Sequence, residues 1–114
     1  MADRPRDVSH ILDRIAAADL PLPPVLAGKI DLGRVGHIGH SYGAYTTMAL
    51  AGGVFDNGQP SFLDARILAH VALSPQGQGN IGSYDDGPDD NTWRGITKPM
   101  FNLIGEREQN ATIV

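Results

Sequence analysis

The sequence contains no cysteine, no surplus of basic residues and no long apolar run. Without cysteine, the chain has neither a disulfide framework nor a thiolate metal site. Nine basic residues stand against 13 acidic residues, which gives a formal net charge of −4. Proteins that bind nucleic acid usually offer a basic patch to the phosphates. Nucleic acid is therefore not expected as a partner.

Targeting and membrane segments are not indicated either. The first ten residues carry charges where a signal peptide needs an apolar core. No apolar run approaches the roughly 20 residues that cross a bilayer. We therefore expect a cytoplasmic protein with no membrane contact. The length of 114 residues, with 41% apolar residues, predicts one domain over residues 1–114.

Helical and strand patterns alternate along the chain. Apolar residues recur at helical spacing over residues 4–19, and prolines at positions 21, 23 and 24 are expected to end that helix. The other expected elements are strands at 35–40, 66–73 and 100–104, a helix at 42–53, a surface loop at 74–92 and a helical turn at 93–96. This order predicts an α/β fold, with a parallel sheet of about three strands and flanking helices.

The pentapeptide Gly39-His40-Ser41-Tyr42-Gly43 matches Gly-x-Ser-x-Gly, the pattern of a nucleophile elbow. In such an elbow a strand turns sharply into a helix and exposes a serine hydroxyl at the bend. A strand is expected before Ser41 and a helix after it, as the motif requires. Side chains at Gly39 and Gly43 are expected to collide with the neighbouring strand and helix. Ser41 is the candidate nucleophile.

A base for Ser41 is harder to find. Among the four histidines, His10 falls on the polar side of the first helix, His37 and His70 fall within strands, and His40 points away from the serine at the turn. In the nucleophile-elbow fold the histidine follows the acid in the chain, but no histidine follows His70.

Acidic residues offer candidates for the third member of a triad and for a metal site. Glu106 and Glu108 follow the last expected strand and are candidate acids. Aspartates gather at positions 85, 86, 89 and 90, but their spacing does not match a calcium-binding loop. We expect no metal.

Four stretches together resemble the central part of an α/β-hydrolase, with greatest similarity to the dienelactone-hydrolase-like and platelet-activating-factor-acetylhydrolase-like branch. They are residues 4–13, 31–43, 64–75 and 96–100. The resemblance spans residues 4 to about 108. It implies a partial α/β-hydrolase core and a serine hydrolase that acts on carboxylic esters without a metal or organic cofactor.

The resemblance also assigns roles to three residues. Ser41 matches the nucleophile, and the backbone N–H of Tyr42 matches one half of the oxyanion hole. Glu108 matches the catalytic acid, at a position where the family usually has aspartate.

The family contains segments that this sequence lacks. It has several strands before the first helix, including the loop with the second oxyanion N–H, and a later strand and helix that bear the catalytic histidine. We therefore expect a truncated α/β-hydrolase-like domain whose chemistry is incomplete or completed by a partner chain. Three parallel strands would leave two exposed edges, so a homo-oligomer or a complementary chain is expected.

Three functions stay open from the sequence. The first is a serine ester hydrolase with a small-molecule ester substrate, incomplete alone or completed in trans. The second is a non-catalytic binding or assembly module that retains the fold. The third is a small esterase with an unconventional base among His37, His40 and His70.

Overall fold

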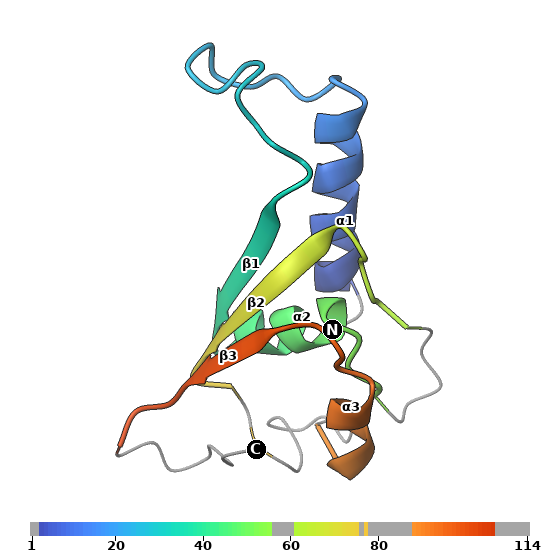
Figure 1. Cartoon of the computed structure of the whole chain (residues 1–114), viewed down its shortest axis with the longest axis vertical. Coiled ribbons are helices and arrows are strands. Elements are labelled where there is room, and N and C mark those ends of the chain that lie inside the picture. Colours follow the sequence, from blue (N-terminus) through green and yellow to red (C-terminus); the bar gives the residue numbers. More distant parts are fainter. Residues whose placement is uncertain (1–2, 56–60, 76, 78–87, 107–114) are drawn as a thin grey trace.

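The computed structural model describes residues 3–55, 61–75, 77 and 88–106. The fold is a small α/β fold, in which a three-stranded sheet carries flanking helices (Figure 1). Its elements are α1 (Asp3–Ala16), β1 (Val35–His40), α2 (Tyr42–Leu50), β2 (Ile67–Leu73), α3 (Asp90–Arg94) and β3 (Met100–Leu103). In the part of the chain that is described, no helix is long and apolar enough to cross a membrane.

Helix α1 forms where the apolar spacing predicts it, but it ends three residues earlier than expected. The N–H of Asp19 donates to the carbonyl of Arg14, and that of Ala18 donates to the carbonyl of Ile15. These two bonds, with Ala18 at φ 54°, form a Schellman turn. The turn ends α1 before the first proline is reached. Ile11, one of the apolar residues that recur at helical spacing in this segment, is nevertheless 50% exposed.

The three strands are parallel, in the order β1-β2-β3, as the sequence predicts. The register pairs His37 with His70 and His70 with Met100. An irregularity lies at the start of the first pairing, where Val35 pairs with Ile67 but Gly36 pairs with Ala69. The extra residue in β2 places Ile67 and His70 on the same face although they are three positions apart. Both are 1% exposed.

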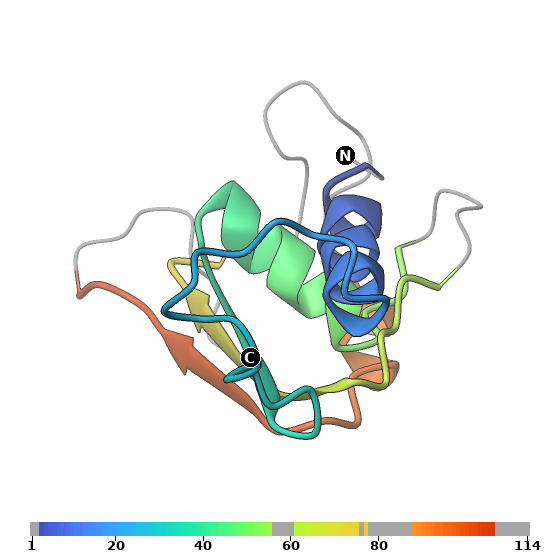
Figure 2. The ribbon, with the colours of Figure 1, turned by 90° about the horizontal axis from the view of Figure 1, so that it is seen from above.

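Helices α1 and α2 lie on the same side of the sheet (Figure 2). Helix α2 is buried from Ala44 to Leu50, because it packs against β1 and β2 on one side and contacts α1 on another. Two apolar clusters form this core. One consists of Tyr45, Met48, Ala49 and Phe55, and the other of Leu12, Leu50 and Ile67.

Helix α3 corrects the expected loop. The sequence predicts a loop over 74–92 and a helical turn at 93–96, but α3 begins at Asp90. The Asp89 carboxylate accepts hydrogen bonds from the N–H groups of Asn91 and Thr92, and the Thr92 hydroxyl accepts one from the N–H of Asp89. This reciprocal cap starts the helix earlier than composition indicates.

An ion-pair network joins α1 to the start of β2. The guanidinium of Arg66 forms a two-bond contact with the Asp64 carboxylate, at 2.6 and 2.9 Å, and also pairs with Asp13 of α1 at 2.7 Å. The Ser9 hydroxyl donates to Asp64 at 2.8 Å. Asp64 is only 7% exposed. Its pKa is lowered to about 2, mainly by the hydrogen bonds from the Arg66 side chain.

Candidate functional site

Ser41 lies at the carboxyl end of β1, where the chain turns into α2 (Figure 1). Its backbone has φ 56° and ψ −115°, a combination that residues other than glycine rarely adopt. The N–H of Ser41 donates to the carbonyl of Leu73 at 3.0 Å, and its own carbonyl accepts from the N–H groups of Ala44 and Tyr45. Bonds to β2 and to α2 therefore hold this strained turn from both sides.

The side chain of Ser41 is not used to cap α2. The first N–H groups of a helix lack partners within the helix, and the helix dipole gives this end a partial positive charge. The first turn of α2 contains no acidic residue. Ser41 thus precedes an end of the helix that favours a developing negative charge, and the N–H of Tyr42 belongs to that end.

The two glycines of the motif differ in what surrounds them. A Cβ on Gly39 would lie 2.1 Å from the carbonyl oxygen of Gly43 and 2.7 Å from the Thr47 hydroxyl oxygen. A Cβ on Gly43 would have no atom of another described segment within 4 Å. The predicted collision is confirmed for Gly39 and wrong for Gly43, because the described residues bring no strand or side chain close to the second glycine.

His37 is fixed beneath the first turns of α2. The Thr47 hydroxyl donates to the carbonyl of Gly43 at 2.9 Å, so its oxygen is left to accept from Nδ1 of His37, also at 2.9 Å. This arrangement assigns the ring proton to Nδ1. Burial lowers the pKa of His37, and the neighbouring His70 lowers it further. His37 is held by α2 and not by Ser41.

The other histidines do not reach Ser41 either. His70 is 1% exposed, and neither of its ring nitrogens has a hydrogen-bond partner among the residues that the structure describes. His40 is exposed and, as the residue before Ser41 in β1, lies on the sheet face opposite His37. His10 is exposed on α1. The structure shows no hydrogen bond between a histidine and Ser41 among the described residues.

The candidate acids are not brought to Ser41. Glu106 is exposed in a turn after β3, and β2 lies between that strand and β1. Glu108 lies outside the described residues, as do Asp85 and Asp86. Asp89, considered above for calcium, is the cap of α3.

Sequence reasoning missed a second strained serine. Ser74 follows β2 as Ser41 follows β1, with φ 49°, and its N–H donates to the carbonyl of Leu103 at 2.8 Å. The pairing of His40 with Leu73 places the two serines side by side at the carboxyl edge of the sheet. Ser74 is followed by proline and stands in no Gly-x-Ser-x-Gly motif, so no pattern in the sequence marks it.

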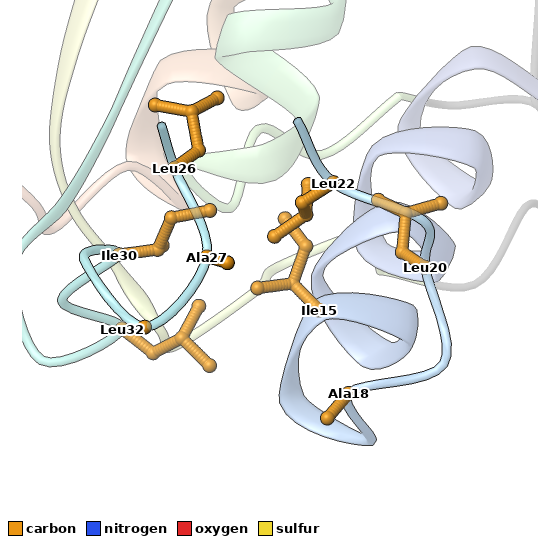
Figure 3. Close-up of a pocket in the computed structure, with 9 residues that line it drawn as sticks. Ile15, Ala18, Leu20, Leu22, Leu26, Ala27, Ile30 and Leu32 are labelled. Atoms are coloured by element: carbon orange, nitrogen blue, oxygen red, sulfur yellow. The ribbon is translucent and has the colours of Figure 1, made fainter. Parts of the chain in front are cut away.

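An apolar pocket lies away from this edge. It has a volume of about 300 Å³ and lies between the end of α1 and the connector that leads into β1 (Figure 3). In this view Ile15 and Leu22 line one side of the pocket, and Ala27, Ile30 and Leu32 line the other. All its lining residues are apolar or glycine. Because the connector enters the opposite end of β1 from Ser41, the pocket offers no group to chemistry at the serine.

Comparisons of the chain with models of protein families, with curated proteins and with solved structures find no match. The site is therefore interpreted from its own geometry.

Burial of the two histidines predicts a stability that falls with acidity. Burial is the main cause that lowers the pKa of His70, with a further contribution from Lys98 and a partial opposing effect of the Pro99 carbonyl. As the pH falls, His37 and His70 therefore take up protons at a higher pH in the unfolded chain than in the folded chain. The free energy of unfolding then decreases as the pH falls below about 6.5. In that range each histidine lowers the free energy of unfolding by up to about 1.4 kcal/mol for each unit by which the pH falls.

Urea unfolding at pH 7.5, 6.5 and 5.5 measures this effect. We expect the free energy of unfolding to fall at each step, and the slope to become shallower in His70→Asn. The same substitution at His10, which is exposed on α1, is the matched control and should leave the slope unchanged. Equal stability of the unsubstituted protein at the three pH values would contradict the prediction.

Proposed function

We propose that the chain is a serine ester hydrolase of α/β-hydrolase type, with Ser41 as nucleophile and with an active site completed by groups outside the described residues or by a partner chain. The observation that carries the proposal is the conformation of Ser41. A non-glycine residue is held at φ 56° between a parallel strand and a helix, which is the setting of a nucleophile elbow. Strain of this kind costs about 1–3 kcal/mol and is concentrated at functional sites.

The proposed reaction begins with attack by the Ser41 hydroxyl oxygen on the carbonyl carbon of a small-molecule ester. The serine proton passes to a base, and the negative charge on the former carbonyl oxygen is stabilised by the N–H of Tyr42 and a second donor. Collapse of this intermediate releases the alcohol, which takes up the proton, and leaves an acyl-serine. Water then attacks the acyl group, releasing the carboxylic acid and restoring the Ser41 hydroxyl. The chemistry needs no metal or organic cofactor.

The base and the second donor are the parts that the proposal assigns to a completing segment. His37 is engaged with Thr47, and His70 is enclosed, so neither supports the alternative of an unconventional base. Glu108 is the proposed acid, on the resemblance alone. One oxyanion donor is worth about 10²–10³ in rate. A chain that lacks a base and a donor should therefore turn esters over very slowly.

A second candidate function is a non-catalytic module that retains the fold. It is favoured by the absence of any hydrogen bond between Ser41 and a histidine in the described part of the chain. In that case the strained turn would be a remnant of an ancestral site.

A fluorophosphonate probe, which reacts with activated serines, distinguishes the two functions. Because the described residues bring no base to Ser41, we expect the unsubstituted chain to be labelled slowly. The labelling should still reach one probe per chain, because the α2 dipole and the Tyr42 N–H favour the charged intermediate at Ser41. Ser41→Ala should lose the label. Ser74→Ala is the matched control, because it removes the neighbouring strained serine, and it should retain the label.

Each result has a definite meaning. Absence of labelling in the unsubstituted chain would favour the non-catalytic module. Ester turnover that survives in Ser41→Ala would exclude Ser41 as the nucleophile.

A further inference from the structure

Six side chains form two rows across the sheet face that is turned away from the helices. The register places Ile38, Val71 and Phe101 side by side in one row, and His40, Leu73 and Leu103 in the next. We call this surface the open face; it consists of Ile38, His40, Val71, Leu73, Phe101 and Leu103. Its outer residues are well exposed: Ile38 by 63%, Phe101 by 61% and Leu103 by 55%.

In the described part of the chain, helices cover the other side of this sheet. Both α1 and α2 lie there (Figure 2), and within residues 3–55, 61–75, 77 and 88–106 no helix packs on the open face. Parallel sheets are normally covered on both faces, because their strands are apolar on both sides. The open face therefore has the character of a surface that is buried in an assembly.

The chemistry of the open face restricts its partner. Five of its six side chains are apolar, and the sixth is the imidazole of His40. A nucleic acid or a charged peptide would find no counter-charge there. The chain carries a net charge of −4, but the open face contains no acidic side chain. Two copies can therefore approach through this face without repulsion between acidic groups in the contact. The open face is thus complementary to itself, as a two-fold interface requires.

The exposed area fits a weak contact. Ile38, Phe101 and Leu103 together expose roughly 350 Å² of surface, at about 150–250 Å² for a large side chain. Two copies would therefore bury about 700 Å² of this surface. This area is below the about 1,200–2,000 Å² of stable interfaces and corresponds to a weak, reversible association.

We propose that the open face is a homodimer interface, in which two copies of the chain pack their sheets face to face. Packed sheets lie about 10 Å apart, and their inward side chains interdigitate. Ile38, Val71 and Phe101 form the middle of the contact. The proposal goes beyond the hydrolase function, because these six side chains take no part in the proposed chemistry at Ser41.

Sedimentation equilibrium from about 1 to 200 μM tests the proposal. We expect a reversible dimer, with a Kd that rises at least tenfold in Phe101→Asp and in Ile38→Asp, because each places a charge in an apolar contact. Val25→Asp is the matched control, since Val25 is 68% exposed on the connector, and its Kd should stay within twofold. A monomer at all concentrations, or a dimer that neither open-face variant weakens, would overturn the proposal.

Cross-linking gives a second readout that does not require a destabilising charge. The chain has no cysteine, so Val71→Cys introduces a single thiol at the centre of the open face. A bismaleimide that spans about 10 Å, the separation of packed sheets, should join two copies efficiently in Val71→Cys and poorly in Val25→Cys. Equal cross-linking of the two variants would overturn the proposal, whatever the fluorophosphonate probe shows.

Discussion

Gly39→Ala is expected to destabilise the protein by about 3–5 kcal/mol, a large part of the 5–15 kcal/mol typical of a folded domain. The new Cβ would lie 2.1 Å from the carbonyl oxygen of Gly43 and 2.3 Å from its carbonyl carbon. Both are backbone atoms of the first turn of α2, so no side-chain rotation relieves the contact. Helix α2 would have to move away from β1, and the core beneath it would open. Urea unfolding followed by circular dichroism measures the loss.

Gly43→Ala is the matched control for this prediction. It adds the same methyl group to the other glycine of the motif, where the described residues bring no atom of another segment within 4 Å of the new Cβ. Alanine is favoured over glycine in a helix by up to about 1 kcal/mol, so Gly43→Ala should be neutral or slightly stabilising. If the two variants lost equal stability, the close approach of β1 and α2 at Gly39 would be wrong.

Arg66→Ala is expected to cost about 3 kcal/mol. It removes the two-bond partner of Asp64, whose carboxylate is 7% exposed, and a buried charge that loses its partner is strongly destabilising. It also releases Asp13, so that α1 loses a link to the start of β2. Urea unfolding at pH 7 measures the loss. Arg34→Ala is the control, because Arg34 pairs with Asp31 on an exposed surface, and it should cost less than about 1 kcal/mol.

The loss of stability between about pH 4 and pH 2 gives this prediction a second readout. The pKa of Asp64 is lowered to about 2 in the folded chain, so its contribution is present above about pH 4 and is lost as the pH falls towards 2. In Arg66→Ala that loss should be smaller, because the main cause of the lowered pKa is gone. If Arg66→Ala lost as much stability as the unsubstituted protein between about pH 4 and pH 2, or more, the role assigned to Arg66 would be contradicted.

Local patterns were sufficient to predict the order of elements around Ser41. The run from Val35 to His40 is bounded by glycine and followed by an apolar helix. The strand has the expected bounds, and the helix begins at the expected residue but ends at Leu50, three residues before its expected end. The end of α1 was predicted less well. Prolines forbid a helix beyond them, but they do not prevent a Schellman turn at Ala18 from ending it sooner.

Features that depend on side-chain partners were harder to predict. The cap at Asp89 needs Thr92 to return the hydrogen bond, and the cluster of neighbouring aspartates concealed this pair in a stretch that reads as a loop. The irregularity at the start of β2 depends on how that strand pairs with β1. Likewise, the difference between Gly39 and Gly43 depends on the neighbours that the fold places beside each residue.

The parallel pairing of the strands also has a consequence for how the protein folds. Val35 pairs with Ile67, and His70 pairs with Met100, so each strand is about 30 residues from its partner along the chain. No hairpin can nucleate this sheet, and each pairing requires the closure of a long loop. Chains dominated by such distant contacts fold in milliseconds to seconds rather than microseconds. During that interval β1 is not yet paired with β2. Rapid dilution from denaturant at high protein concentration should therefore favour aggregation over refolding.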